Sequence, residues 1–194
     1  MAARILATKV RYRTRGQGEA FAGGILHDIG KLVLSQFFPE EFSEILHLVS
    51  TEDIYIGKAE ETVLGLTHAE VGAWLGERWN MPKQLVDAIG YHHMPGRLPP
   101  REAELPALIH LADFLCRREQ IGDGGSARMP SLDPAALRTF GIHEEPKAAM
   151  RRIFGYGEEL QREMENASAF ASIARGVDAD GEGSEGDAQE RKVG

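Results

Sequence analysis

The residues of this sequence that are best able to do chemistry are histidines and aspartates that recur along the chain. A His-Asp pair, a single histidine, a His-His pair and a lone aspartate fall on four segments that are predicted to be helical. Imidazole nitrogens and carboxylate oxygens together suit Fe, Mn, Zn, Ni or Mg. As a set they predict a divalent metal site, whose candidate ligands are His27, Asp28, His68, His92, His93 and Asp113.

Asp113 carries the strongest single indication. Its helix is apolar around nearly its whole circumference, so its carboxylate is expected to be buried. A buried carboxylate without a partner costs several kcal/mol or shifts its pKa. Either a metal meets this need, or His110, three residues earlier on the same face, forms a local hydrogen bond with it.

The other candidates also have structural interpretations. His27 suits a core histidine that pairs with a backbone carbonyl. His92 and His93 lie where a helix ends, and the helix dipole favours cationic histidine there. His68, in the first turn of a helix, is explained equally well as an exposed residue.

Three further side chains bear on the same hypothesis. Lys31 lies one turn after His27, where its ammonium could steady a phosphate oxygen bound to the metal. His47 falls off the apolar face of its helix and His143 falls in a loop, so both are interpreted as surface residues.

The elements that must position these residues are all helices. Apolar residues recur every three or four positions, and strand-like alternation is almost absent. Thr67 and Glu70 have the spacing of a capping box, and Asp133-Pro134 supplies an N-cap and a first-turn proline. The sequence therefore predicts an all-α bundle, with helices over residues 2–13, 19–36, 39–50, 58–65, 68–79, 82–91, 104–118, 134–140 and 144–173.

Composition narrows the class of protein. The chain has 194 residues, 42% of them apolar and 27% charged, which is ordinary globular usage. Its single cysteine, Cys116, excludes an internal disulfide and favours a reducing compartment. The net charge of -8 argues against binding to duplex DNA, although Arg4, Lys9, Arg11, Arg13 and Arg15 form a basic N-terminal segment without acids.

The sequence contains no apolar run of membrane-spanning length and no signal peptide, so the protein is expected to be cytoplasmic. The C-terminal residues 175–194 are acidic and glycine-rich with almost no sizeable apolar side chains, and such a segment cannot bury enough surface to fold. We expect one helical domain over residues 1–174, followed by a disordered acidic tail over 175–194.

Five stretches of the sequence resemble the HD superfamily of metal-dependent phosphohydrolases, and the HDOD domain of signalling proteins in particular. The resemblance covers about residues 1–120. Its carriers are the segment 19–34 around His27-Asp28, Thr67-His68-Ala69-Glu70-Val71-Gly72-Ala73-Trp74-Leu75, Trp79-Asn80-Met81-Pro82, His92-His93-Met94-Pro95 and Leu111-Ala112-Asp113.

The resemblance implies an HD-type helical bundle with a metal centre among its helices. His27, Asp28 and Asp113 match the core ligands, and Asp28 matches a carboxylate that bridges two metals. His68, His92 and His93 match ligands of a second metal in the related HD-GYP phosphodiesterases. Lys31 matches a lysine near the substrate phosphate. By this resemblance Asp28 and Lys31 are the candidate catalytic residues, and His68, His92 and His93 complete the ligand set.

The sequence departs from the family pattern in three ways. HD enzymes take a further histidine ligand from an upstream helix, and none of the 26 residues before His27 is a histidine. HDOD proteins carry an N-terminal lobe that this sequence does not display. After His93 the sequence reads Met94-Pro95-Gly96 in place of a Gly-Tyr-Pro signature. These departures predict an incomplete metal site and argue against cyclic di-GMP as a substrate.

Two functional hypotheses follow. The first is a regulatory HDOD domain that contacts other signalling proteins and holds a metal or a nucleotide as ligand. The second is an active metal-dependent phosphohydrolase acting on a nucleotide or cyclic dinucleotide. A third interpretation is a helical scaffold whose histidines are all structural.

If the first helix has lost a neighbouring lobe, Ile5, Leu6 and Val10 form an exposed apolar strip, which predicts self-association through residues 2–13. The alternative is that this strip folds back onto the bundle core.

Overall fold

The computed structural model describes residues 1–10, 12, 17–122, 128 and 131–179, without the side chains of residues 146 and 167–179. Over these residues the chain is helical and contains no strand, which confirms the predicted all-α class. The chain divides into two units, residues 1–161 and residues 162–194. The metal-ligand candidates all belong to the first unit.

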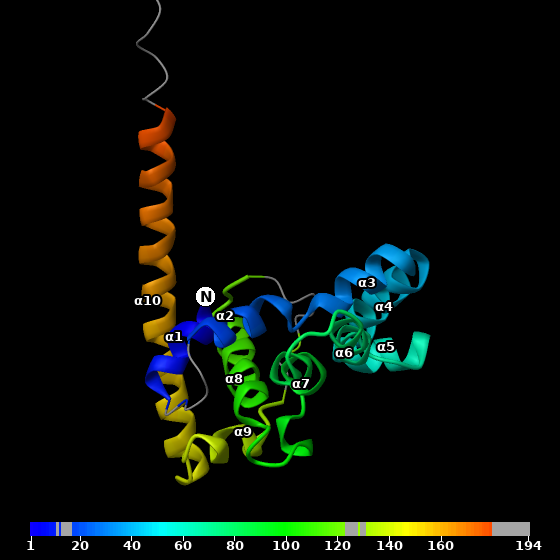
Figure 1. Ribbon diagram of the computed structural model, residues 1–194, viewed down its shortest axis with the longest axis horizontal. Helices are drawn as coiled ribbons and strands as arrows, with labels where there is room; N and C mark the ends of the chain where they lie inside the picture. Colours follow the sequence, from blue (N-terminus) through cyan, green and yellow to red (C-terminus); the bar gives the residue numbers. More distant parts are fainter. Residues whose placement is uncertain (11, 13–16, 123–127, 129–130, 180–194) are drawn as a thin grey trace, which may run out of the picture. The chain divides into compact units, whose positions relative to one another are not determined.

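Figure 1 shows the helices of the described residues. In chain order they are α1 (Ala2–Lys9), α2 (Gln17–Leu26), α3 (Ile29–Phe37), α4 (Pro39–Glu52), α5 (Ile56–Leu64), α6 (His68–Arg78), α7 (Lys83–Tyr91), the short 3-10 helix η1 (Pro95–Arg97), α8 (Glu104–Arg118), α9 (Pro134–Thr139) and α10 (Pro146–Ala179).

Helix α8 forms the centre of the first unit. Its apolar side chains are almost all buried, including Leu105, Leu108, Ile109 and Leu115 at 2% exposure or less. It packs against α1, α2, α7 and α9, which surround it in Figure 1. Because it has neighbours on most sides, it is apolar around most of its circumference, as the sequence indicated.

A break at His27 and Asp28 divides the helix that was predicted over residues 19–36. Helix α2 ends at Leu26 and α3 begins at Ile29. Two glycines explain the break, because each allows close contact with a different partner. A Cβ on Gly23 would lie 3.2 Å from a side-chain carbon of Ile109 in α8, and one on Gly30 would lie 1.9 Å from the backbone oxygen of His68 in α6. The two halves thus pack on different helices, and His27 and Asp28 lie at the joint.

Both predicted N-caps are confirmed. The Thr67 hydroxyl accepts a hydrogen bond from the Glu70 N–H, and the Glu70 carboxylate accepts one from the Thr67 N–H. Asp133 caps α9 by accepting from the N–H of Ala135. The first of these caps fixes where α6 begins and therefore where His68 lies.

The apolar strip expected to be exposed on the first helix is largely buried. Leu6 and Val10 are 3% and 7% exposed, because α1 packs against α2 and α8 within the same chain. The folded-back alternative is therefore correct, and the strip no longer supplies a reason for self-association. Arg11, Arg13 and Arg15 of the basic segment lie outside the described residues.

The C-terminal helix extends further than the sequence suggested. Helix α10 continues to Ala179, so residues 175–179 are helical, whereas they were predicted to belong to a disordered tail. Residues 180–194 lie outside the described residues. Among the helices that the structure describes, none has the length and apolar character needed to cross a membrane.

Candidate metal centre

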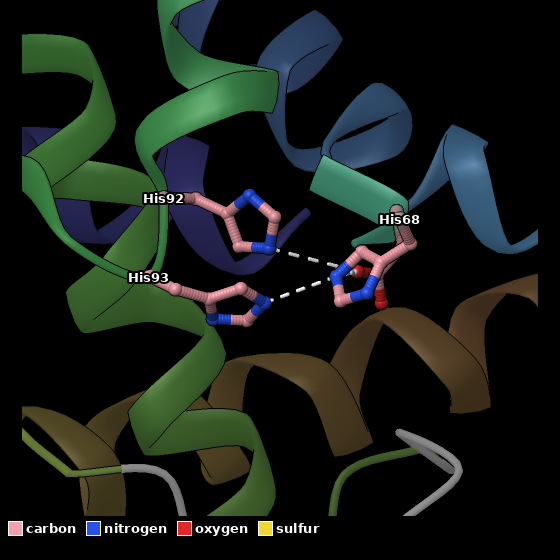
Figure 2. A group of neighbouring side chains, drawn as sticks. His68, His92 and His93 are labelled. Atoms are coloured by element: carbon pink, nitrogen blue, oxygen red, sulfur yellow. Dashed lines mark hydrogen bonds and ion pairs between the residues drawn. The ribbon is translucent and has the colours of Figure 1, made fainter. Parts of the chain in front are cut away.

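Four side chains predicted as metal ligands converge at one place in the first unit. Asp28, His68, His92 and His93 each offer a ligand atom, and these four atoms lie within 4.8 Å of one another. Figure 2 shows the three imidazoles turned toward each other. His68 and His92 are completely buried, whereas Asp28 and His93 are only partly buried, so the cluster borders the protein core.

Each of these side chains lies at a helix end. Asp28 directly precedes α3, His68 is the first residue of α6, and His92 and His93 directly follow α7. Close packing brings the ends together, since Gly30 lets α3 lie against the backbone of α6. Gly72 does the same between α6 and α7, where a Cβ would lie 2.6 Å from a side-chain carbon of Ile89.

The two carboxylate oxygens of Asp28 face different groups. Oδ1 lies 3.3 Å from His68 Nε2 and 3.6 Å from His92 Nε2. Oδ2 accepts a hydrogen bond of 2.7 Å from Lys31 Nζ and lies 3.5 Å from His27 Nε2. Burial by itself raises the pKa of Asp28, but the histidines and Lys31 outweigh it and hold this pKa well below its usual range. Asp28 is therefore an anion at every ordinary pH.

Glu60 of α5 orients His68. The Glu60 side chain is fully buried, and its carboxylate accepts hydrogen bonds from His68 Nδ1 at 2.7 Å and from the His68 backbone N–H at 2.9 Å. With the proton on Nδ1, the lone pair of the neutral ring lies on Nε2, toward Asp28. Burial lowers the pKa of His68, but Asp28 and Glu60 together raise it above its ordinary value.

His92 has the same orientation for a different reason. Its Nδ1 donates to the backbone oxygen of Ile89 at 2.8 Å, which leaves the Nε2 lone pair aimed at Asp28. Burial lowers the pKa of His92 to about 4, so the ring is neutral at pH 7. Neutral imidazole is the form that binds metals.

The fourth side chain, His93, is held by a tyrosine. The Tyr55 hydroxyl lies 2.7 Å from Nδ1 and 2.6 Å from Nε2 of His93, and His93 Nε2 lies 3.0 Å from His68 Nε2. Burial is the main cause that lowers the pKa of His93 well below its ordinary value. Burial raises the pKa of Tyr55, so its hydroxyl keeps its proton and acts as the donor.

These donors fit a divalent cation. Within the described residues, Asp28 Oδ1 and His92 Nε2 are buried without a hydrogen-bond partner, although they lie close together. Both are acceptors when Asp28 is ionised and His92 is neutral, so they repel unless a proton or a cation lies between them. Buried polar atoms normally have partners, and a cation is the partner that would satisfy both. Three imidazoles and one carboxylate suit Zn, Mn or Fe, and the Glu60–His68 pair is the outer carboxylate that metal-bound histidines usually have.

The structure places two other predicted residues beside the cluster. The ring of His27 packs edge-on against His92 with 5.0 Å between centroids, and its Nδ1 lies 3.0 Å from the backbone oxygen of Gly24. Lys31 is bound to Asp28 Oδ2. His27 is thus adjacent to the four converging atoms, on the same side of Asp28 as Lys31.

Asp113 is held by a partner on its own helix. Its two carboxylate oxygens accept from Arg117 Nε at 3.0 and 3.1 Å, one turn along α8. This ion pair meets the need for a cation that the sequence indicated, and Asp113 is not among the four converging ligands. His110 does not bond to Asp113, because its Nδ1 donates to the backbone oxygen of His92 and its Nε2 accepts from the N–H of Asp133. His47 and His143 are exposed, as predicted.

Two residues of the site were absent from the predicted set. Glu60 falls on the apolar face of α5, four residues after Ile56 and three before Val63, and a carboxylate in that position has the same signal that singled out Asp113. Tyr55 precedes α5 in a short connection, and nothing in its local sequence indicates a contact with His93, 38 residues further along the chain.

Known proteins share this fold and part of this sequence. A solved HDOD domain protein of unknown function from Geobacter sulfurreducens is 28% identical, with a TM-score of 0.62 over 91% of this chain and 58% of its own. A candidate signal transduction protein from Marinobacter aquaeolei is 26% identical, with a TM-score of 0.65 over 89% of this chain and 36% of its own. A candidate phosphohydrolase from Shewanella amazonensis shares the fold at 22% identity, with a TM-score of 0.58 over 83% of this chain and 56% of its own.

The family match covers the part of the chain that holds the cluster. An uncharacterised protein of Treponema pallidum is 28% identical over 96 residues, which are 50% of this chain and 18% of the relative. This chain therefore spans only part of the length of the proteins that it matches. The family model of the HDOD domain matches residues 1–95, the segment that supplies all four converging ligands. Residues 1–95 accordingly belong to the HDOD domain family.

Proposed function

We propose that this chain is a regulatory HDOD domain of signal transduction that binds one divalent metal through Asp28, His68, His92 and His93. The observation that supports it is the buried pair of acceptors, Asp28 Oδ1 and His92 Nε2, which have no hydrogen-bond partner within the described structure. The partners of such a domain are other signalling proteins, a nucleotide being a further ligand.

The protein side chains around the proposed metal have distinct roles. Asp28 supplies the negative charge, and His92 and His93 are neutral donors whose protons do not compete near pH 7. Glu60 holds His68 with its Nε2 toward the cluster. A bound divalent metal would supply a positive charge able to polarise a phosphoryl oxygen or to acidify water.

The arrangement around Asp28 favours a single metal. Its Oδ1 faces the histidines, whereas its Oδ2 is already neutralised by the Lys31 ammonium at 2.7 Å. A carboxylate that bridges two metals needs both oxygens free of such a cation. Asp113, the ligand that the family resemblance assigned to the core, is paired with Arg117. A one-metal site with part of the ligand set engaged elsewhere suits binding and regulation better than hydrolysis.

Metal analysis of the purified protein tests this proposal. We expect about one equivalent of Mn, Fe or Zn per chain by elemental analysis after incubation and desalting. Asp28→Ala should lose that equivalent, because the only formal negative charge in the ligand set is removed. The exposed His47 provides the control, since His47→Ala removes an imidazole outside the cluster. Equal metal content in all three proteins would show that the cluster is not the binding site.

The second candidate function is phosphoester hydrolysis. It is favoured by Lys31, whose side chain is 14% exposed and whose ammonium lies directly beside the proposed metal ligand Asp28, where it could contact a phosphate. We expect little or no turnover of cyclic di-GMP with added Mn²⁺ or Fe²⁺. Robust hydrolysis that is lost in Asp28→Ala and retained in His47→Ala would make the enzyme the better description.

A further inference from the structure

A second concave site lies apart from the histidine cluster. It is a pocket of about 600 Å³ where the segment before α8, the end of α9 and the first half of α10 meet. Its lining includes three arginines, Arg101, Arg138 and Arg152, with Glu104 as its one acidic residue. None of the four converging metal ligands contributes to it. This volume is in the range of pockets that hold a small organic ligand, and larger than a lone inorganic ion requires.

Two acidic residues close in sequence to the lining form hydrogen bonds with groups outside the pocket. Glu102 accepts a hydrogen bond from Lys83 of α7 at 2.6 Å, and Asp133 accepts from the backbone N–H groups of Gly96 and Ala135. In the described part of the chain, the guanidinium groups of Arg101 and Arg138 have neither an ion pair nor a hydrogen bond. Both side chains are exposed and therefore available to a ligand.

Arg152 is the positioned member of the three. Its Nη1 donates to Glu144 at 2.9 Å and its Nε donates to the Tyr156 hydroxyl at 3.0 Å. These bonds hold the guanidinium in the wall of the pocket, and Nη2 keeps its donors for another acceptor. The lining therefore carries three cations against one acid, in a chain whose net charge is -8.

Such a set of groups recognises phosphate. Guanidinium presents paired N–H donors that match two oxygens of a phosphate, and it stays charged at any physiological pH. Phe140 and Pro100 add apolar surface to the same lining, which suits the organic part of a ligand. We propose that this pocket binds a small phosphorylated molecule of nucleotide size, at a site separate from the metal centre.

Calorimetric titration tests the proposal on the whole chain in the presence of EDTA, which removes metal-dependent binding. The probes are ADP and pyrophosphate, with adenosine as the uncharged counterpart. We expect ADP and pyrophosphate to bind and adenosine not to bind. Higher NaCl should weaken the binding, because charge-assisted contacts are screened.

Substitutions of the lining arginines test whether ADP binds in this pocket. Arg101→Gln and Arg138→Gln should each weaken ADP binding about tenfold, which is about 1.4 kcal/mol, because each removes a charge-assisted hydrogen bond. Arg78→Gln, an exposed arginine of α6 outside the lining, is the matched control and should bind ADP normally. Asp28→Asn should also bind ADP normally, since it alters only the metal centre.

Several results would overturn the proposal. They are equal binding of adenosine and ADP, unchanged binding in the Arg101→Gln/Arg138→Gln double variant, or a loss of binding in Arg78→Gln as large as in the pocket variants. Loss of ADP binding in Asp28→Asn would instead move the ligand to the metal centre. Because both arginines are exposed, the variants should keep the wild-type thermal unfolding midpoint, which confirms that any loss of binding is local.

Discussion

Glu60 offers the sharpest test of how the metal centre is built. Its carboxylate is completely buried and accepts from both Nδ1 and the backbone N–H of His68. Glu60→Gln preserves the volume but replaces one acceptor oxygen with an NH₂ donor. The carboxylate meets the backbone N–H with Oε2 and Nδ1 with both oxygens, whereas the amide has a single acceptor oxygen for the two groups. If the NH₂ group faces Nδ1, the proton of His68 moves to Nε2, and that nitrogen can no longer bind a metal.

The size of the effect follows from this loss of orientation. Outer partners of metal-bound histidines are typically worth 10–100-fold in metal affinity, which is about 1.4–2.7 kcal/mol. We therefore expect Glu60→Gln to weaken Mn²⁺ or Zn²⁺ binding by about that factor in a competition titration against a coloured chelator. The matched control is Glu61→Gln, because Glu61 is the neighbouring residue, is exposed and pairs only weakly with Lys58 at 3.4 Å.

A second measurement separates an electrostatic role from a purely structural one. Glu60 and Asp28 raise the pKa of His68, so in the metal-free protein Glu60→Gln should lower that pKa, as followed by NMR titration of the histidine ring protons. A folded Glu60→Gln protein with wild-type metal affinity and an unchanged His68 pKa would refute the reasoning. So would an equal loss of affinity in Glu61→Gln.

Two other predictions concern packing and pH. Gly30→Ala should destabilise the protein by about 3 kcal/mol or more in a chemical denaturation experiment, because the new Cβ would lie 1.9 Å from the His68 backbone oxygen. Gly18→Ala, where the new Cβ meets nothing within 4 Å, should change stability by less than about 1 kcal/mol. Metal binding should weaken on acidification, by about tenfold per pH unit below the pKa of His68, since that ring must lose its Nε2 proton to bind. Because this pKa is raised, the weakening should begin at a higher pH than for an ordinary histidine, and an affinity independent of pH between 5 and 8 would contradict it.

Periodicity in the sequence predicted the helices but could not predict the break between α2 and α3. The apolar spacing from Phe21 to Leu34 runs through His27 and Asp28 without interruption, so it indicates one helix. The break depends on which helix each half packs against, and Gly23 and Gly30 meet α8 and α6 respectively. Such contacts between distant segments leave little trace in local spacing.

The candidate site, like the fold, could be predicted from the sequence only in part. Asp28, His68, His92 and His93 were recognisable by their residue types, their order and their resemblance to a family, and their ligand atoms do converge. Asp113 was also recognisable as a buried carboxylate, but Arg117, one turn later on the same helix, supplies its cation. Tyr55 could not be predicted, because its hydroxyl reaches His93 from a connection remote in sequence.

His110 connects the metal centre with the arginine pocket. Its Nδ1 donates to the backbone oxygen of His92, and its Nε2 accepts from the N–H of Asp133, the residue that caps α9. Burial lowers the pKa of His110, which keeps the ring in the neutral form that can both donate and accept. Arg138, in the last turn of α9, is part of the pocket lining. A continuous run of hydrogen bonds thus joins a proposed metal ligand to the helix that carries a proposed phosphate contact. Any movement of α9 that a ligand caused would act on the backbone of His92, which is a physical route by which a domain of this kind can convert binding at one site into a change at another.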